Sequence, residues 1–433
     1  MVNIYPLHAW RYNTAQLGNL NKLCSPLFDV ITPAQRKQLY EISPYNSIHI
    51  SVPRTTPQDL QSIIYQWKRD KIILKDVLPS IYVYYQYFSL QGKIHVRKGF
   101  IANLQLNDIE KTVLPHENTL LDSVIERTEV LHYTQMNVSP THGLYSDPQH
   151  TLEPLLDKYM QNPIYRYVDY QGVEDRMAII QDAKDIIFIM NHLKNKNIYL
   201  ADGHHRYESS MRYYIQQKKN NPYHTGKEGY NYHLMYFTAL ESEGIRILPT
   251  HRLLRNVDEK ALLQQIEPYF NLQKVDNSSL LSWQIQGQKH TFGIITAQAK
   301  YIARLKVDIE RIIPQKMNSV LKNLDYTLLH YGIFENIMGI DIESQRSWQN
   351  LSFLRDEKVV AQKIHFGEAN IAFIMNSVSK EQMQQVCESG QIMPMKSTYF
   401  YPKVICGFVF GSIDEQDNQS PFMTQFHIGT NFA

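Results

Sequence analysis

The stretch IYLADGHHRYESS, at residues 198–210, brings together residue types that bind anions and transfer protons. A short apolar run, typical of a buried strand, leads into Asp202 and Gly203, and a helical pattern begins within one or two residues of His204. The first turn of a helix has free N–H groups and a partial positive charge, and glycine permits a positive φ or a close backbone approach. The pattern predicts a strand–turn–helix site for a phosphorylated or otherwise anionic ligand.

Each side chain of this motif has a chemistry of its own. Arg206 can donate two hydrogen bonds to phosphate or carboxylate oxygens. His204 and His205 can donate to phosphate oxygens, accept a proton or ligate a metal. Asp202 can orient a histidine or bind a hard cation such as Mg²⁺ that bridges to a phosphate. A plainer alternative stays open, in which Asp202 caps the helix, Gly203 makes a tight turn and the histidines face solvent.

A general acid or base for such a site is offered by LPHENT at residues 114–119, through His116 and Glu117. The alternative is a polar loop with a buried, hydrogen-bonded histidine. Asp29 and Arg127 are further candidates.

Two other polar segments could add groups that contact a phosphate. Arg252, after the apolar run GIRILP, is a candidate second cation, or else a surface residue paired with an acid. Lys396, Ser397 and Thr398 combine a lysine with two hydroxyls, as a phosphate site requires, although the same three residues also suit a simple turn.

The surrounding elements alternate between helices and strands, which predicts an α/β (mixed α+β) fold with mixed sheets. Capping patterns at Thr32-Pro33 and Thr56-Pro57 predict two early helices, and Ser379 predicts a third that ends at Gly390. Period-two patterns predict a hairpin, followed by a third strand or its continuation, over 80–106 and a final strand over 403–413. A polar loop is expected at 217–232. We expect an N-terminal α/β part at 1–255, which carries the DGHHR motif, and a C-terminal α/β part at 256–433.

Composition narrows the class of protein. The 433 residues contain 44 Lys and Arg against 42 Asp and Glu, so the formal charge is +2, and we expect no nucleic-acid partner. Apolar runs are too short to cross a membrane, and the first residues lack a signal-peptide pattern, so we expect a soluble cytoplasmic protein. The 3 cysteines show no metal-binding spacing, and HExxH is absent. We therefore expect no structural zinc, haem or flavin.

Six segments together resemble domain of unknown function family 1015, found in bacteria and archaea. They are SPLFDVITPAQR (25–36), LPHENT (114–119), NVSPTHGLYSD (137–147), ADGHHRYESS (201–210), ILPTHRLL (247–254) and MPMKSTYFYPKVICG (393–407). One departure stands out, since the family pattern near residue 26 has two prolines and a tyrosine where this chain has Pro26, Leu27 and Phe28. An aromatic hydroxyl at position 28 therefore has no role here.

The strand–DGHHR–helix arrangement also resembles, more distantly, the phosphate-binding motif of the ParB/sulfiredoxin superfamily. The resemblance implies a ParB/sulfiredoxin-like N-terminal part in which Gly203, His204, His205 and Arg206 bind phosphate and Asp202 lies at the catalytic edge. Sulfiredoxin chemistry needs a cysteine between the glycine and the arginine, where this chain has histidines, and a partition protein needs a basic DNA-binding face. The superfamily also includes free-serine kinases, and neither of these two requirements excludes a resemblance to that branch.

That branch implies a small-molecule phosphotransferase or phosphohydrolase, with serine or O-phosphoserine as the best single substrate and Mg²⁺ and a nucleotide as candidate cofactors. The partner would be a small phosphorylated metabolite or a nucleotide. Two alternatives stay open, namely a non-enzymatic nucleotide-binding regulator and a scaffold protein in which DGHHR only begins a helix. There is no GxxxxGK[ST] sequence, so a P-loop kinase is not expected.

Overall fold

The computed structural model describes residues 1–54, 56, 58–108, 111–276, 278 and 280–418. Its contacts divide the chain into two compact units. Unit 1 contains residues 1–114, 119–246 and the segment from Pro402 onward, and unit 2 contains residues 115–118 and 247–401. The single boundary that we predicted, between 255 and 256, differs from this division. The chain enters unit 2 at Ile247 and returns to unit 1 at Pro402, and residues 115–118 also belong to unit 2. The division differs from the prediction because the units are defined by contacts between residues that are distant in sequence.

Unit 1 combines a large sheet with helices on both of its faces. Its strands are β1 (Ile4–Tyr5), β2 (Trp10–Tyr12), β3 (Ile73–Lys75), β4 (Ile81–Leu90), β5 (Lys93–Gln105), β6 (Val113–Leu114), β7 (Met136–Asn137), β8 (Thr141–Tyr145), β9 (Tyr165–Val168), β10 (Glu174–Ile180), β11 (Ile198–Asp202), β12 (Tyr232–Ala239) and β21 (Gly411–Ser412). Its helices are α1 (Thr14–Leu17), η1 (Leu20–Lys22), α2 (Pro33–Ile42), α3 (Ile48–Ser51), α4 (Asp59–Arg69), α5 (Leu121–Thr134), α6 (Glu153–Met160), α7 (Ala183–Leu193), α8 (His204–Asn220), η2 (Gly229–Asn231) and α16 (Glu415–Asn418).

The strand order of the main sheet sets where the DGHHR motif lies. Across the described residues the order is β6-β11-β8-β12-β5-β4-β10-β9, and β1 pairs with β5 outside this path. β11 is parallel to β6 and β12 is parallel to β8, whereas β4, β5, β9 and β10 pair antiparallel. The sheet is therefore mixed, and the predicted α/β (mixed α+β) class is confirmed.

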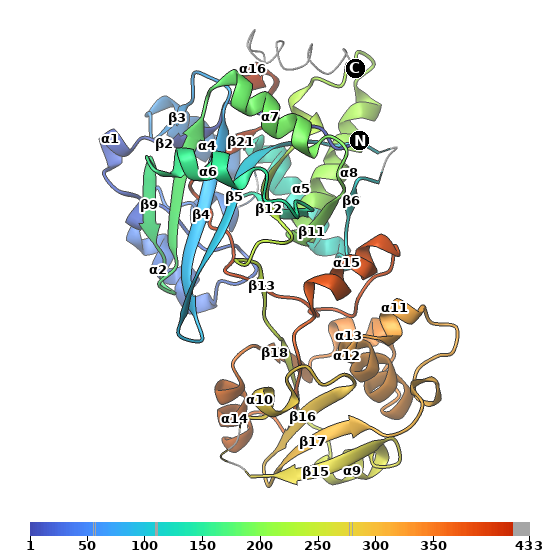
Figure 1. The fold of residues 1–433 in the computed structure, drawn as a ribbon. Helices are drawn as coiled ribbons and strands as arrows, with labels where there is room; N and C mark the ends of the chain where they lie inside the picture. The colour runs from blue at the N-terminus through green and yellow to red at the C-terminus, as the bar shows by residue number, and fades with distance from the viewer. Residues whose placement is uncertain (55, 57, 109–110, 277, 279, 419–433) are drawn as a thin grey trace. The chain divides into compact units, whose positions relative to one another are not determined.

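Both faces of this sheet are buried because its side chains alternate between two apolar clusters. On β4, Ile81 and Val83 join a cluster that includes residues of α6 and α7, which cover this face (Figure 1). Tyr82 and Tyr84 point to the opposite face and join a cluster with α4 and the segment 404–410. Each large apolar side chain buried in this way contributes roughly 1.5–3 kcal/mol, so the sheet is a stable platform for the strand ends.

Unit 2 is built on a smaller antiparallel sheet. Its strands are β14 (His251–Leu254), β15 (Phe270–Val275), β16 (Thr291–Thr296), β17 (Lys300–Leu305), β18 (Leu351–Leu354), β19 (Ile371–Ile374) and β20 (Phe400–Tyr401), and β13 (Arg246–Ile247) lies where the chain enters the unit. Its helices are α9 (Glu259–Ile266), α10 (Leu281–Ile285), η3 (Ile309–Arg311), α11 (Ser319–Lys322), α12 (Asp325–Thr327), the π-helix η4 (Leu328–Ile337), α13 (Ile342–Ser347), α14 (Glu357–His365) and α15 (Lys380–Glu388). In the described chain the sheet order is β15-β17-β16-β19-β14-β18, and α10 and α14 share an apolar cluster with it (Figure 1).

Several local predictions are confirmed. Thr32 and Ser379 both form full capping boxes at the starts of α2 and α15. The hairpin over 80–106 is β4 and β5, joined through Gln91 and Gly92, whose φ angles of 52° and 76° suit a tight turn.

Other local predictions need correction. The loop predicted at 217–232 is shorter, because α8 continues to Asn220 through lysines and glutamines, which are good helix formers. The final strand predicted over 403–413 is not formed, and only β21 is a strand there among the described residues. Single bridges at Cys406 and Phe410 hold this segment, whose apolar side chains fill the sheet's second cluster. Pro57, in the second capping pattern, lies outside the described residues, and α4 begins at Asp59. No described helix has the length and apolarity needed to cross a membrane.

Candidate functional site

The DGHHR motif forms the predicted turn between β11 and α8. Gly203 has φ 89° and ψ 30°, a left-handed conformation that side chains other than glycine rarely adopt. A Cβ atom at Gly203 would also lie 2.7 Å from Thr141 Cγ2 and 2.9 Å from Arg206 Nη2. Both the backbone angle and the close approach of Arg206 therefore require glycine here.

Arg206, in the first turn of α8, is held over this turn by the loop that precedes β8. Its Nη1 donates to Ser139 Oγ at 2.9 Å and to the Pro140 carbonyl at 2.7 Å. Its Nη2 lies 3.9 Å from Asp202 Oδ2. Its Nε is buried and has no hydrogen-bond partner within the described structure. The guanidinium is thus fixed in place while one of its donors stays available.

Arg127, on α5, is a second buried guanidinium with a donor available. Its Nη1 donates to the Ser51 carbonyl at 2.6 Å, and its Nη2 contacts the carboxylate of exposed Glu126 at 2.5 Å. Its Cζ lies 4.5 Å from the centre of the Phe28 ring, a cation–π contact. Its Nε is buried without a partner among the described residues. Burial lowers the pKa of Arg127, and the positive charge of Arg206 lowers it further.

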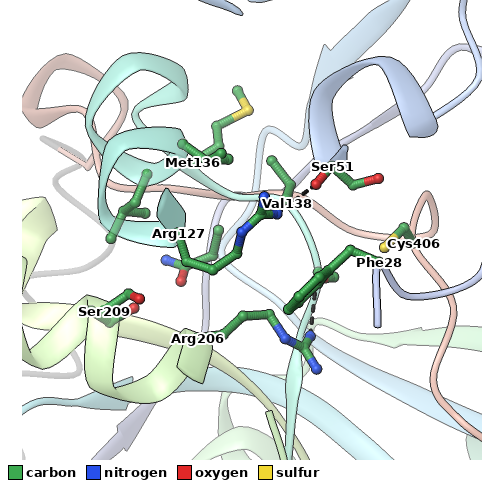
Figure 2. A pocket seen from close by; sticks show the side chains of 13 residues that line it. Phe28, Ser51, Arg127, Met136, Val138, Arg206, Ser209 and Cys406 are labelled. Carbon is green, nitrogen blue, oxygen red and sulfur yellow. Dashed lines mark hydrogen bonds between the residues drawn. The ribbon is translucent and has the colours of Figure 1, made fainter. Parts of the chain in front are cut away.

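The two arginines line one cavity of about 40 Å³ (Figure 2). A water molecule needs roughly 10–15 Å³ by this measure, so the cavity holds a group of a few heavy atoms. Its lining, within the part of the chain that the structure describes, contains no aspartate or glutamate and consists of Phe28, Ser51, Arg127, Val130, Leu131, Met136, Asn137, Val138, Ser139, Arg206, Ser209, Ser210 and Cys406. Figure 2 shows Arg127 and Arg206 reaching from their two helices toward Phe28. The cavity is therefore small, largely apolar and electropositive.

Asp202 lies between two cations at the end of β11. Lys403 Nζ donates to its Oδ1 at 2.7 Å, and Arg206 lies on the side of Oδ2. Burial raises the pKa of Asp202, but the charges of Lys403 and Arg206 outweigh burial and hold the pKa well below its usual value. Such a carboxylate is a weak base, so we assign Asp202 to positioning Arg206 rather than to proton transfer.

Asp202 also does not fit the metal-binding role that we expected. Two cations already neutralise it, and the part of the chain that the structure describes contains no group of three or more His, Cys, Asp or Glu residues placed to hold a metal ion.

The two histidines of the motif, His204 and His205, are not among the described residues that line the cavity. His204 is buried at the start of α8, and His205 Nε2 accepts a hydrogen bond from the Leu120 backbone N–H at 3.0 Å. A ring nitrogen that accepts this bond cannot also donate to a phosphate, so His205 holds the start of α5 against α8. The phosphate role predicted for His204 and His205 stays a prediction.

The other predicted site residues lie in unit 2 and form a cluster there. His116 Nε2 lies 2.8 Å from Thr398 Oγ1, and the Lys396 backbone N–H donates to Glu117 Oε1 at 3.4 Å. Ser397 is buried and its hydroxyl donates to the Pro394 carbonyl at 2.6 Å. The structure therefore brings the PHENT and KST segments together, although 282 positions separate His116 from Thr398.

Arg252 makes structural contacts in unit 2 and is not the surface residue of our alternative interpretation, whereas its predicted role as a second cation for a phosphate stays a prediction. It is fully buried, with Nε donating to His330 Nε2 at 3.1 Å and Nη2 donating to the Met395 carbonyl at 2.8 Å. Its Cζ lies 4.4 Å from the centre of the Tyr326 ring. Burial lowers its pKa to about 10. Its donors serve protein acceptors, and it is neither exposed nor paired with an acid.

Sequence reasoning gave too little weight to Arg127 and missed Lys403. Arg127 carried a signal, because the buried residues of α5 include Val124, Arg127 and Leu131, so an arginine sits in the apolar stripe of a helix. Lys403 lies within the KSTYFYPK segment, but nothing local tied it to Asp202. Asp29, a further candidate, is exposed next to Phe28.

Comparisons with known proteins add the following. The family described as protein of unknown function (DUF1015) matches residues 4–327. No curated protein matches the chain. Among solved structures, free serine kinase in complex with AMP is 10% identical, with a TM-score of 0.34 over 67% of this chain and 83% of that chain. SbnI with C-terminal truncation from Staphylococcus aureus is 9% identical, with a TM-score of 0.36 over 77% of this chain and 95% of that chain. A conserved hypothetical protein from Pyrococcus furiosus is 10% identical, with a TM-score of 0.35 over 68% of this chain and 89% of that chain. Values this low leave function to be argued from the site itself.

Proposed function

The chain belongs to the DUF1015 family of proteins of unknown function, and we propose that it is a small-molecule phosphotransferase or phosphohydrolase whose phosphate site is the cavity between Arg206 and Arg127. One observation carries the proposal. Both guanidinium groups line the same small cavity, and each keeps a buried Nε–H group without a partner in the described residues.

Electrostatics favours an anion in this cavity. Burying a charge costs free energy unless an opposite charge or hydrogen bonds compensate it. Among the described residues, the cavity lining has two arginines and no carboxylate, and Asp202 and Glu126 contact these arginines from outside it. An anionic ligand would add compensation from within the cavity and would accept hydrogen bonds from both Nε–H groups. Bonds of this charge-assisted kind contribute about 1.5–3 kcal/mol each.

The size of the cavity favours a phosphoryl group over a whole nucleotide. About 40 Å³ accommodates a few heavy atoms. The apolar lining, which includes Val130, Met136 and Val138, would keep water away and strengthen the arginine–phosphate attraction. A nucleotide would place only a phosphate there, with its base elsewhere.

Serine or O-phosphoserine is the substrate that we propose, on the strength of the ParB/sulfiredoxin-like motif. A nucleotide would be the phosphoryl donor in the transfer direction, and water would be the acceptor in the hydrolytic direction. Because Asp202 does not fit a metal ligand, we derive no step through Mg²⁺. We propose a cytoplasmic location, where the three buried cysteines Cys24, Cys387 and Cys406 stay as free thiols.

A non-enzymatic nucleotide- or phosphate-binding regulator is the second candidate. The observation that favours it is that two expected proton-transfer groups of the motif are engaged, Asp202 with Lys403 and His205 with the Leu120 N–H. Ligand binding without turnover is the result that separates this candidate from an enzyme.

The test is a thermal-shift screen with inorganic phosphate, pyrophosphate, ATP, ADP, serine and O-phosphoserine, followed by phosphate-release and phosphoryl-transfer assays. A ligand at a hundredfold excess over its dissociation constant adds about 2.7 kcal/mol of stability. Arg206→Ala and Arg127→Met are expected to weaken phosphate binding by tenfold or more, at about 1.4 kcal/mol per tenfold. Arg212→Ala is the matched control, because Arg212 is an exposed arginine on the same helix. Equal phosphate binding by Arg206→Ala and Arg212→Ala would overturn the proposal.

A further inference from the structure

A buried row of two hydroxyls and an imidazole adjoins the cavity of unit 1. Ser210, on α8, lines the cavity, and its Oγ lies 2.8 Å from His233 Nδ1. His233, on β12, places its Nε2 2.7 Å from Thr141 Oγ1 on β8. All three side chains are buried. A hydroxyl, a base within hydrogen-bond reach and a third group that orients the base form the general arrangement of an activated nucleophile.

The fold accounts for this row without reference to a ligand. β8 and β12 are parallel neighbours in which Thr141 pairs with Met235, so His233, two positions earlier, projects from the same face of the sheet as Met235. Helix α8, which follows the DGHHR turn, brings the Ser210 hydroxyl within hydrogen-bond distance of the His233 ring. Tyr207, one turn earlier on α8, packs edge-on against His233 with ring centres 5.5 Å apart, which fixes the plane of the imidazole.

We propose that Ser210 is the nucleophile of the phosphoryl transfer, with His233 as its base and Thr141 as the residue that positions His233. The proposal rests on the proposed function, because the phosphoryl group would be held by Arg206 and Arg127. Thr141 Oγ1 accepts the Nε2–H of His233, which leaves Nδ1 to accept the Ser210 hydroxyl proton.

The chemistry balances in two half-reactions. In the first, Ser210 Oγ forms a bond to phosphorus, the bond from phosphorus to the leaving oxygen breaks, and the hydroxyl proton passes through His233 to that leaving oxygen. In the second, water or an acceptor hydroxyl forms a bond to phosphorus and gives its proton to His233, the bond between phosphorus and Ser210 Oγ breaks, and His233 returns the proton to Ser210 Oγ. Water as acceptor gives hydrolysis and a metabolite hydroxyl gives transfer, so one intermediate serves both directions of the proposed function.

Two neighbouring nucleophiles in the cavity lining are less suited to this role. The Ser209 hydroxyl lies 2.9 Å from the Val124 carbonyl and 2.6 Å from the His205 carbonyl, so its single proton is donated to a backbone oxygen rather than to a side-chain base within the described structure. Burial raises the pKa of Cys406, although the charge of Arg206 opposes this, and the sulfur stays a thiol rather than the reactive thiolate.

The basicity of His233 is expected to depend on whether a phosphate ligand is bound nearby. Burial lowers the pKa of His233 to about 3, and the charge of Arg206 contributes to the decrease. The ring is therefore neutral, and without a ligand it is a weak base. A phosphate dianion beside Arg206 would offset that positive charge, so the imidazole becomes a stronger base when the ligand is present.

The experiment exposes the purified full-length protein to acetyl phosphate and, separately, to O-phospho-L-serine. Intact-mass and peptide-mapping measurements then look for one added HPO₃ group. The expected result is phosphorylation of Ser210 in the wild type and in Arg212→Ala, whose exposed side chain lies outside the cavity lining, and none in Ser210→Ala. His233→Asn is expected to slow formation of the adduct by roughly 10²–10⁴-fold, the usual contribution of a general base.

The thermal shift that inorganic phosphate causes in the same variants distinguishes failure of the Ser210 assignment from failure of the proposed phosphate site. Wild type that is stabilised by inorganic phosphate but carries no adduct, or carries it on another residue, refutes the role of Ser210 and leaves the phosphate site standing. Wild type that neither binds phosphate nor is modified refutes both. The assignment in the wild type does not depend on whether Ser210→Ala folds.

Discussion

Substitution of Gly203 by alanine tests how the DGHHR turn holds Arg206. The φ of 89° places the new residue in the left-handed region, at a cost of about 1–2 kcal/mol. Its Cβ would lie 2.7 Å from Thr141 Cγ2 and 2.9 Å from Arg206 Nη2, and overpacking of this kind costs about 1–3 kcal/mol. The expected loss of stability is therefore about 2–5 kcal/mol in total. Arg206 must also move, so phosphate affinity should fall by about tenfold or more, as expected when one charge-assisted hydrogen bond is lost.

Gly172→Ala is the matched control for this substitution. Gly172 also lies in unit 1 and has a φ of 78°, but no atom of the described residues lies within 4 Å of the place that a Cβ would take there. The control therefore carries the backbone cost of about 1–2 kcal/mol without the contact with Arg206. Urea unfolding, read through hydrogen exchange of β4 and β5 peptides, measures the stability of unit 1, and calorimetry measures phosphate affinity. If Gly203→Ala and Gly172→Ala lose equal stability and both bind phosphate like the wild type, the geometric reasoning is refuted.

Three further substitutions test buried charges. Lys403→Met should destabilise unit 1 by about 3–5 kcal/mol, because it leaves the Asp202 carboxylate without its closest partner. The depressed pKa of Asp202 contributes stability that is present above about pH 4 and lost as the pH falls further, so the acid-induced loss of stability in urea unfolding should be smaller in this variant. Burial raises the pKa of Asp175 to about 8. The folded protein then keeps a proton that the unfolded chain releases, so stability should fall as the pH rises from about 4 to 8, and Asp175→Asn should flatten this slope. Arg252→Met should destabilise unit 2 by roughly 3 kcal/mol, because several buried acceptors lose a donor, while phosphate titration of unit 1 stays unchanged. Loss of phosphate binding in a folded Arg252→Met protein would contradict the structural role of Arg252.

Short sequence patterns predict the features that depend on neighbours within a few residues. The capping boxes at Thr32 and Ser379, the hairpin closed by Gln91 and Gly92, and the strand–turn–helix at DGHHR are all visible in short patterns. The position of Gly203 between an apolar run and a helix likewise indicates a turn that uses the conformational freedom of glycine. In each case the hydrogen bonds and φ angles involved lie within one turn of helix or one strand end.

The side chains that share the candidate site are brought together by contacts between distant parts of the folded chain. Arg127 and Arg206 are far apart in sequence, and Lys403 lies 201 positions from its partner Asp202. Sequence patterns show that a strand exists but not which strand it pairs with, and the pairing of β8 with β12 places Thr141 beside His233. The histidines of DGHHR attracted the functional prediction because of their type, yet His205 bonds a backbone N–H group and the two arginines line the cavity. Residue type is local information, whereas burial and available hydrogen-bond donors depend on contacts with distant parts of the chain.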